Sequence, residues 1–287
     1  MPTSDVAAPW PDALRSAVVA RVGPDHAREQ LDGLGGREVV RLRGPAGSAV
    51  LKRGQHERET RFYRDLAPVL DAGVRAPHAY HVDPEWLLLE DVPQPLSRDR
   101  WLADSAVMRS LAALHRSRRA LAALTDPFLP SWDADQTEAA VDRLDADDRA
   151  TAARALERLR LEADRWLTGD ALVSADPNPR NWGERADGTP VLFDWERVGR
   201  ATPAVDVAIT VPGLPSRDQV ELASQAYLAV QQRDHVHWSG AEFTRGLVVV
   251  KAWTCVELLA DRREVAQLAE LQRWLAARLP AWLDAIP

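Results

Sequence analysis

Asp176, Asn181 and Asp194 are the residues whose types and spacing best suit chemistry. Asp176 and Asn181 lie five residues apart in one loop, and Asp194 ends the apolar run Val191-Leu192-Phe193. In phosphoryl transfer, one carboxylate accepts the proton of an attacking hydroxyl, while an amide oxygen and a second carboxylate hold Mg²⁺. Mg²⁺ usually takes one or two carboxylates together with phosphate and water. The three residues therefore predict a phosphoryl-transfer site, provided that the fold brings them together.

Each of these residues alone is weak evidence. An Asp before a proline, such as Asp176 before Pro177, is more often a turn residue. Asp194 strengthens the prediction because it follows a short strand candidate beyond the turn 186–189. The two carboxylates could then face each other across a short loop.

Two further side chains could complete such a site. Lys52 and Lys251 are the only lysines among 36 basic residues, and Lys52 ends the strand candidate Ser48–Lys52. A helix predicted over His56–Ala67 carries Glu59 on an otherwise apolar stripe. A carboxylate there requires a partner, and we expect Lys52 to provide it. We expect Glu57 to pair with Arg61 at the surface instead; the alternative is that Glu59 is also a solvated charge.

The elements before residue 93 predict a small antiparallel sheet that could bind a nucleotide. A glycine-rich stretch containing Gly35 and Gly36 precedes strand candidates at 37–43 and 48–52, and its backbone could approach phosphates or form a plain loop. Further strands are predicted over His78–Val82 and Trp86–Glu90. The backbone of Glu90 to Val92 then resembles a hinge whose polar groups could bind an adenine edge, although an ordinary loop fits as well.

After about residue 95 the apolar residues recur with a helical period. The helices predicted from this period are Trp101–Leu124, Glu138–Leu144, Thr151–Trp166, Ser216–Gln232, Gly240–Ala260 and Val265–Ala285. We interpret His115 as a core histidine on an apolar helix. The acidic residues between Asp133 and Asp148 are interpreted as a solvated face, and a wall that binds a cationic substrate is the alternative.

Composition limits the class of protein. The chain has 287 residues, 46% hydrophobic and 28% charged, which is typical of a globular protein. The net charge of −7 argues against nucleic acid or a membrane surface as a partner. A single cysteine, Cys255, and the lack of a basic, then apolar, N-terminal segment favour a cytoplasmic protein. Oligomeric state stays open.

The order of these features resembles the aminoglycoside phosphotransferase-like branch of the protein-kinase-like fold, which includes choline and other small-molecule kinases. The strongest match spans Leu172 to Ala208, with Phe193-Asp194-Trp195-Glu196 followed by Gly199, Pro203 and Asp206. The resemblance implies an α+β, bilobal fold with a small antiparallel-sheet N-lobe at 1–92. It also implies a larger, mainly helical C-lobe at 93–287, carrying the catalytic loop and the substrate pocket.

The resemblance also implies roles. Asp176 would be the catalytic base, and Asn181 and Asp194 the Mg²⁺ ligands. Lys52 would clamp the phosphates while Glu59 holds it. Gly35, Gly36, Glu90 and Val92 would line the nucleotide, and Asp206 would be structural. The cofactors would be Mg²⁺ and ATP or GTP as phosphoryl donor, and the partners would be the nucleotide and a small-molecule substrate.

One residue departs from the family pattern. Ser174 stands where a histidine usually precedes the catalytic Asp by two residues, which puts the rigidity of the loop in doubt. The leading expectation is a Mg²⁺-dependent kinase that phosphorylates a hydroxyl of an aminoglycoside or another amino or hydroxy compound. A catalytically silent nucleotide-binding or regulatory protein on the same fold is the alternative. A metal-dependent hydrolase is less favoured, because no histidine lies between Asp176 and Asp194.

Overall fold

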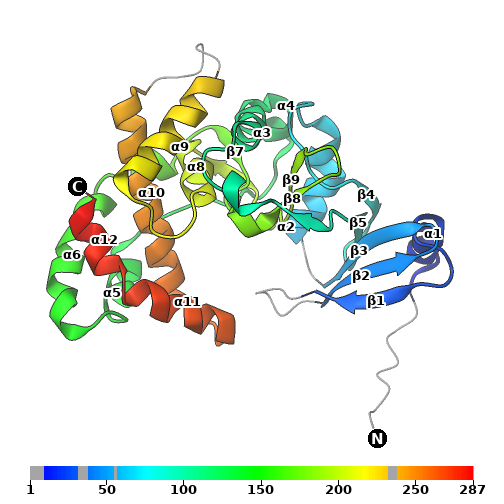
Figure 1. Ribbon diagram of the computed structural model, residues 1–287, viewed down its shortest axis with the longest axis horizontal. Coiled ribbons are helices and arrows are strands. Elements are labelled where there is room, and N and C mark those ends of the chain that lie inside the picture. Colours follow the sequence, from blue (N-terminus) through cyan, green and yellow to red (C-terminus); the bar gives the residue numbers. More distant parts are fainter. Residues whose placement is uncertain (1–9, 32–37, 55–56, 232–237, 287) are drawn as a thin grey trace, which may run out of the picture.

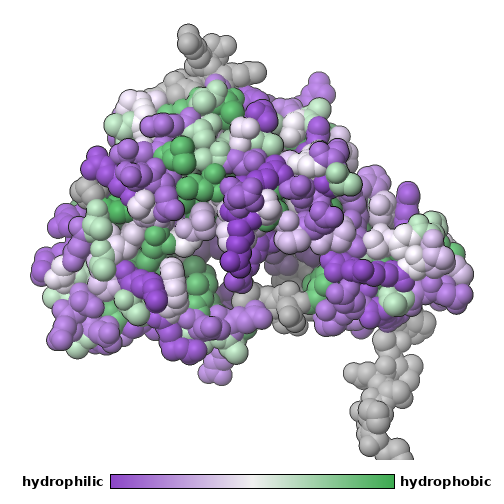
Figure 2. All heavy atoms as spheres, viewed as in Figure 1, coloured by the Kyte–Doolittle hydropathy of each residue, from purple (hydrophilic) through white to green (hydrophobic). Residues whose placement is uncertain are grey.

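The chain folds into two lobes of unequal size, as the computed structural model in Figure 1 shows. The structure describes residues 10–31, 38–54, 57–231 and 238–286. The smaller lobe is built on a sheet, and the larger lobe is mainly helical. Figure 2 shows the molecular face hollowed between them.

The small lobe is a five-stranded antiparallel sheet in the order β1-β2-β3-β5-β4. Helix α1 (Asp12–Arg21) packs on it and buries Leu14 and Val18 in a small core with residues of β2, β3 and β5. The strands are β1 (Ala27–Gln30), β2 (Glu38–Gly44), β3 (Gly47–Arg53), β4 (Ala79–Val82) and β5 (Trp86–Glu90).

Strand β5 separates two cores, and this fixes the direction of Lys52. Trp86 and Leu88 belong to the small core beneath α1, while Leu87 and Leu89 belong to the large core. Since successive side chains of a strand point to opposite faces, both faces of β5 are covered. Lys52 is paired with Leu87 in the β3–β5 register. Lys52 therefore lies on the face directed toward the large lobe.

The segment after β3 begins as predicted but changes its geometry. Helix α2 (Glu57–Arg61) continues into a π-helical turn, η1 (Phe62–Leu66), and a 3-10 turn, η2 (Ala67–Val69). The wider π turn directs Phe62, Tyr63 and Leu66 into the large core.

The large lobe is organised around α10 (Gly240–Ala260), which packs against six other helices and buries residues on most of its sides. It begins with a capping box between Ser239 and Glu242. The remaining helices are α3 (Ser105–Arg116), α4 (Arg118–Ala123), α5 (Ala134–Val141), α6 (Ala146–Arg160), α7 (Ala163–Leu167), α8 (Ala204–Thr210), α9 (Arg217–Val230), α11 (Ala266–Ala276) and α12 (Leu279–Ala285).

Short strands carry the candidate site between the lobes. Strand β7 (Ala171–Val173) pairs with β10 (Gly199–Ala201), and β8 (Trp182–Glu184) lies between β6 (Gln94–Pro95) and β9 (Pro190–Leu192). The loop after β7 carries Asp176 and ends in the 3-10 turn η4 (Pro179–Asn181), and the loop after β9 carries Asp194. Both carboxylates thus follow the end of a strand.

The predicted α+β, bilobal kinase-like fold is confirmed, and the helix predicted over Gly240–Ala260 has those bounds. Other predicted bounds were wrong. The single helix expected over Trp101–Leu124 starts only at Ser105, after the turn η3 (Arg98–Arg100), because the Asp104 carboxylate caps the N–H groups of Ala106 and Val107. It then breaks at Ser117, where ψ is 72°.

Three other predicted helices also differ from the observed ones in number or position. The segments expected at Thr151–Trp166 and Val265–Ala285 are each two helices, α6 with α7 and α11 with α12. The helix expected at Glu138–Leu144 lies earlier, as α5. Among the described residues, no helix is both long and apolar enough to cross a lipid bilayer.

Candidate active site

Lys52 and Glu59 form a buried ion pair. The Lys52 Nζ atom lies 2.7 Å from Oε1 and 2.9 Å from Oε2 of Glu59, whose side chain is fully enclosed. Burial disfavours the ammonium, but the charges of Glu59 and Asp194 outweigh it and raise the pKa of Lys52. Glu57 pairs instead with Arg61 at the surface, at 3.3 Å. The expected choice of Glu59 over Glu57 therefore agrees with the geometry.

Asp176 and Asn181 meet in the loop after β7. The Nδ2 atom of Asn181 donates to Oδ2 of Asp176 at 3.1 Å and to the Asp176 carbonyl at 2.9 Å. Asn178, which was not singled out in the sequence, donates to Oδ1 of Asp176 at 2.9 Å. Burial raises the pKa of Asp176, although Asn178 and Arg197 counteract it. Both carboxylate oxygens are thereby oriented.

Asp194 faces this loop with an oxygen that lacks a partner. Its Oδ1 atom is buried and accepts no hydrogen bond from any described residue. Burial is the main cause that raises the pKa of Asp194 to about 6; Lys52 lowers it, whereas Glu59, Glu196 and Asp176 raise it. A buried carboxylate oxygen without a donor is costly, and it is the group that a hard cation would satisfy.

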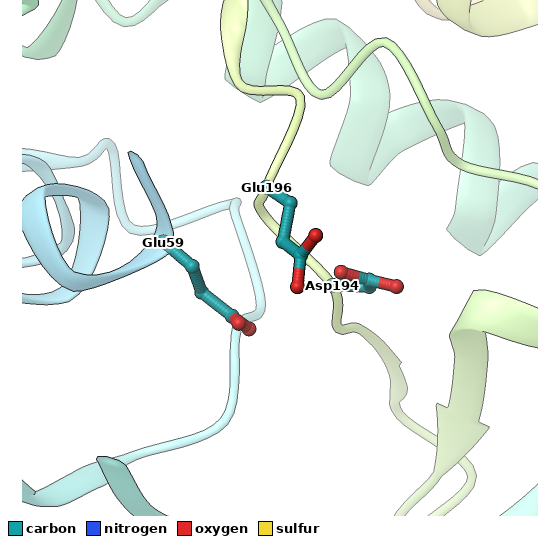
Figure 3. A group of neighbouring side chains, drawn as sticks. All are labelled: Glu59, Asp194 and Glu196. Carbon is teal, nitrogen blue, oxygen red and sulfur yellow. The ribbon is translucent and has the colours of Figure 1, made fainter. Parts of the chain in front are cut away.

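Carboxylates gather on this side of the site. Glu59, Asp194 and Glu196 each offer an oxygen within 4.8 Å of the others, and Figure 3 shows Glu59 approaching the two others from the opposite lobe. Glu196 was missed in the sequence. Glu196 follows Asp194 by two residues, but Asp194 has a left-handed φ of 65° and Glu196 lies in a turn, so the spacing alone did not predict where its side chain points. The donor set fits Mg²⁺.

Asp206 supports the loop that carries Asp176, in line with the structural role expected for it. It is fully buried at the first turn of α8 and accepts hydrogen bonds from the backbone N–H groups of Ser174 and Ala175, at 2.9 and 2.8 Å. It also contacts the Nε2 atom of buried His115 at 3.0 Å, and His115 Nδ1 contacts Tyr227 Oη at 2.6 Å. His115 is thus a satisfied core histidine. Asp206 therefore holds this loop in place even though Ser174 stands where the family usually has a histidine.

Comparison with solved structures places this geometry in a known fold. A choline/ethanolamine kinase family protein from Mesorhizobium loti aligns with a TM-score of 0.63 and 20% identity, over 96% of this chain and 95% of that one. A thermostable mutant of an aminoglycoside phosphotransferase, in ternary complex with AMP-PNP and hygromycin B, aligns at 0.62 and 16%, over 96% and 97%. The fold is that of the small-molecule kinases.

A third structure of this small-molecule kinase fold is choline kinase from Streptococcus pneumoniae, with a TM-score of 0.59 and 15% identity over 93% of this chain and 97% of that one. No family model matches the sequence, and no curated protein matches it. The resemblance seen in the sequence is therefore confirmed through three-dimensional structure, at low identity.

The segment from Glu90 to Val92, expected to be a hinge that binds the adenine edge, stays a prediction, although some of its polar groups are engaged. The backbone N–H of Glu90 is not free, because it donates to the His78 carbonyl at 2.7 Å. The Glu90 side chain forms an ion pair at 2.7 Å with Arg185, the residue that follows β8. Val92 lies against Gly183, where any larger residue would meet Val92 and Phe193. Gly35 and Gly36 lie outside the described residues.

Proposed function

We propose that this protein is a Mg²⁺-dependent phosphotransferase that moves the γ-phosphate of ATP to a hydroxyl of a small molecule. The observation that carries the proposal is the enclosed Asp194 oxygen without a partner, beside Lys52 and the Asp176 loop. The solved structures of this fold that contain ADP or AMP-PNP with hygromycin B support a nucleotide and a small acceptor. GTP as donor stays an untested alternative.

Each side chain has a role in this mechanism. Asp176, oriented by Asn178 and Asn181, accepts the proton of the attacking hydroxyl. Lys52, fixed by Glu59, offers its ammonium to the donor phosphates. Asp194 and the Oδ1 atom of Asn181 would hold Mg²⁺. When bound, the ion would neutralise charge on the phosphates. Most of the rate would come from positioning and charge stabilisation.

We further propose that the nucleotide-binding lobe ends near residue 92 and that residues 93–287 supply the acceptor pocket. The separate small core under α1 and the position of β5 between the two cores support this division. The cytoplasm stays the predicted location.

Replacement of the base tests the mechanism. Asp176→Asn should lower kcat by roughly 10²–10⁴-fold, because it removes proton transfer. The dissociation constant for Mg·ATP should change less than about threefold, since Asp176 contacts the acceptor side. We would measure turnover by ADP release and phosphorylated product over a hydroxyl panel, and nucleotide binding by calorimetry.

Asp187→Asn provides the matched control, because Asp187 is an exposed turn residue near the same strands. Full turnover by Asp176→Asn would remove Asp176 from the mechanism. Binding of Mg·ATP by the unmodified protein, without phosphorylation of any acceptor, would favour the catalytically silent alternative.

A further inference from the structure

Arg197 is a charged residue next to the catalytic loop that the proposed mechanism does not use. It lies three residues after Asp194, and its guanidinium stacks on Phe128, with 4.3 Å to the ring centroid, and lies 5.8 Å from that of Trp253. Both rings are anchored. The Phe128 backbone pairs with Val198 and Arg200, and Trp253 Nε1 donates to the Ser131 carbonyl at 2.8 Å. The guanidinium is therefore held in a fixed place.

The hydrogen bonds of Arg197 are incomplete. Its Nη2 atom contacts both oxygens of Glu257, at 2.9 and 2.8 Å. Its Nε atom is enclosed without a partner, and Nη1 donates to no residue that the structure describes. A guanidinium has five N–H donors and no acceptor. The unused hydrogen-bonding capacity of this guanidinium therefore consists of positively charged donors, while the Glu257 carboxylate is already engaged.

The pair borders the position of the acceptor hydroxyl. The charges of Arg197 and Glu257 both influence the Asp176 carboxylate, and Arg197 follows Asp194 by three residues in the same loop, so the pair lies beside the two proposed site carboxylates. The Arg197 side chain keeps 31% of its surface exposed, so a solute can reach it. The preceding residue, Glu196, joins the carboxylates on the metal side instead. Adjacent residues of opposite charge thus serve the two sides of the reacting centre.

We propose that Arg197 binds a carboxylate of the acceptor, so that the substrate is a small hydroxy acid or hydroxy amino acid. This inference rests on the proposed function. A planar guanidinium matches a carboxylate in geometry as well as in charge, and the Nη1 atom, which is not among the enclosed atoms and donates to no described residue, is the donor that a ligand could reach. A polycationic acceptor would instead meet a fixed positive charge beside Asp176.

The experiment compares acids with their carboxamides on the full chain. Glycerate, L-serine and L-threonine would each be assayed with Mg·ATP beside the matching carboxamide, with choline and hygromycin B as cationic acceptors. We expect kcat/KM for at least one acid to exceed that of its carboxamide by tenfold or more. Comparing kcat/KM for glycerate with that for L-serine and L-threonine shows whether the acceptor is a simple hydroxy acid or a zwitterionic amino acid.

Variants assign the preference to Arg197. Arg197→Met should reduce the acid-to-carboxamide ratio at least tenfold, and Arg197→Lys should restore part of it. Arg217→Met is the control, because Arg217 forms an exposed pair with Glu221 on α9, and it should leave the ratio unchanged. Melting temperatures show whether Arg197→Met folds. If it does not, the acid-to-carboxamide ratio is compared between the unmodified protein, Arg197→Lys and Glu257→Gln. Glu257→Gln should increase acid binding.

Binding measured without turnover separates this inference from the proposed function. Calorimetry on Asp176→Asn with Mg·ADP should show that acids bind and that the additional change Arg197→Met abolishes this binding. If acids bind through Arg197 but no product forms, the kinase proposal fails and the inference stands. Phosphorylation of choline or hygromycin B in preference to every acid, or no acid binding at all, overturns the inference while leaving a kinase.

Discussion

At the scale of single residues, strain and burial concentrate where the chemistry is proposed. Asp194 has a φ of 65°, and Ala175, which precedes Asp176, has a φ of 56°. This left-handed region costs a residue other than glycine about 1 kcal/mol or more. Asp194 adds an enclosed oxygen without a donor. Both costs are understandable if these residues are selected for binding and catalysis instead of stability.

Asp194→Asn tests whether Asp194 lowers the stability of the protein while it serves metal binding. Asn tolerates the left-handed backbone and removes a charge that burial disfavours. We expect the free energy of unfolding of the ligand-free protein at pH 7.5 to rise by about 2 kcal/mol, since a raised carboxyl pKa means that the ionised form is destabilised. The thermal shift produced by Mg·ATP should be lost. An unaltered Mg·ATP shift would exclude Asp194 as a metal ligand.

Lys52→Met should act on both stability and nucleotide binding. The change leaves the Glu59 carboxylate enclosed without its ammonium, which typically costs about 3–5 kcal/mol. Adding Glu59→Gln should recover part of this loss, because the orphaned charge is then removed. Urea unfolding of both single variants and the double variant gives the coupling energy. Additive losses would show that the pair is not coupled, and unchanged Mg·ATP affinity would count against the clamp.

At the scale of elements, the longest helix and most strands of the small lobe could be predicted, and the strand candidate Val191-Leu192-Phe193 overlaps β9, but the other short strands could not be predicted. Helix α10 has a continuous pattern and clear caps, so Gly240–Ala260 was correct at both ends. Strands β7 to β10 have three residues each, which is too short for an alternating pattern to appear. Strand β1 exposes all four of its residues, so it lacks an apolar face as well. These strands are defined by distant partners and not by local sequence.

The same contrast holds for the site. Asp176, Asn181, Asp194, Lys52 and Glu59 stand out because each interrupts an apolar pattern or a turn in a specific way. Arg197 and Glu257 do not, since Arg197 is one of many arginines and Glu257 lies on a helix 60 residues later. Their pairing exists only after the loop 195–198 packs beside α10. Sequence reasoning could therefore find Asp176 and the residues proposed to bind the phosphates, but not the Arg197–Glu257 pair.

Lys251, the second lysine, lies on α10 and makes the stability of the protein depend on pH. Its buried ammonium donates to the Val211 carbonyl at 2.7 Å, and burial lowers its pKa to about 8. Between pH 8 and 10.5 the unfolded chain binds more protons at this residue than the folded chain does, so stability rises with pH. From pH 7 to pH 9 this residue should contribute a gain of about 1.4 kcal/mol.

Lys251→Met should remove that gain, which urea unfolding at pH 7 and pH 9 would measure. Burial raises the pKa of Cys255 to about 11, so the thiol contributes the opposite trend above pH 9. Lys251 itself lowers this pKa, but the thiol of the folded protein stays protonated up to pH 9 in both proteins, so its contribution cancels in their difference. An equal pH dependence in the variant would mean that Lys251 is not the group that titrates.

At the scale of the whole molecule, the two lobes are joined through the same residues that carry the site. Within the small lobe the Lys52–Glu59 pair links β3 to α2, and between the lobes the Glu90–Arg185 pair links the end of β5 to the residue that follows β8. Phe62 of η1 stacks on Trp195, next to Asp194, with 3.9 Å between ring centroids, and both rings are fully buried. A change in the position of α2 would therefore be transmitted directly to the loop that carries Asp194.

Trp195→Leu should accordingly weaken both the fold and the site. Loss of a buried, stacked aromatic ring typically costs about 3 kcal/mol or more, and the Asp194 loop would lose its packing. We expect Mg·ATP affinity to fall together with the free energy of unfolding. Phe62→Leu should have the same effects. The double variant should lose about 1 kcal/mol less stability than the sum of the two single variants, because both substitutions remove the same stacking contact.

Trp274→Leu, at an exposed tryptophan, is the control and should change stability by less than about 0.5 kcal/mol. If Trp195→Leu lowers stability while Mg·ATP affinity stays unchanged, the stack holds the lobes together without positioning Asp194.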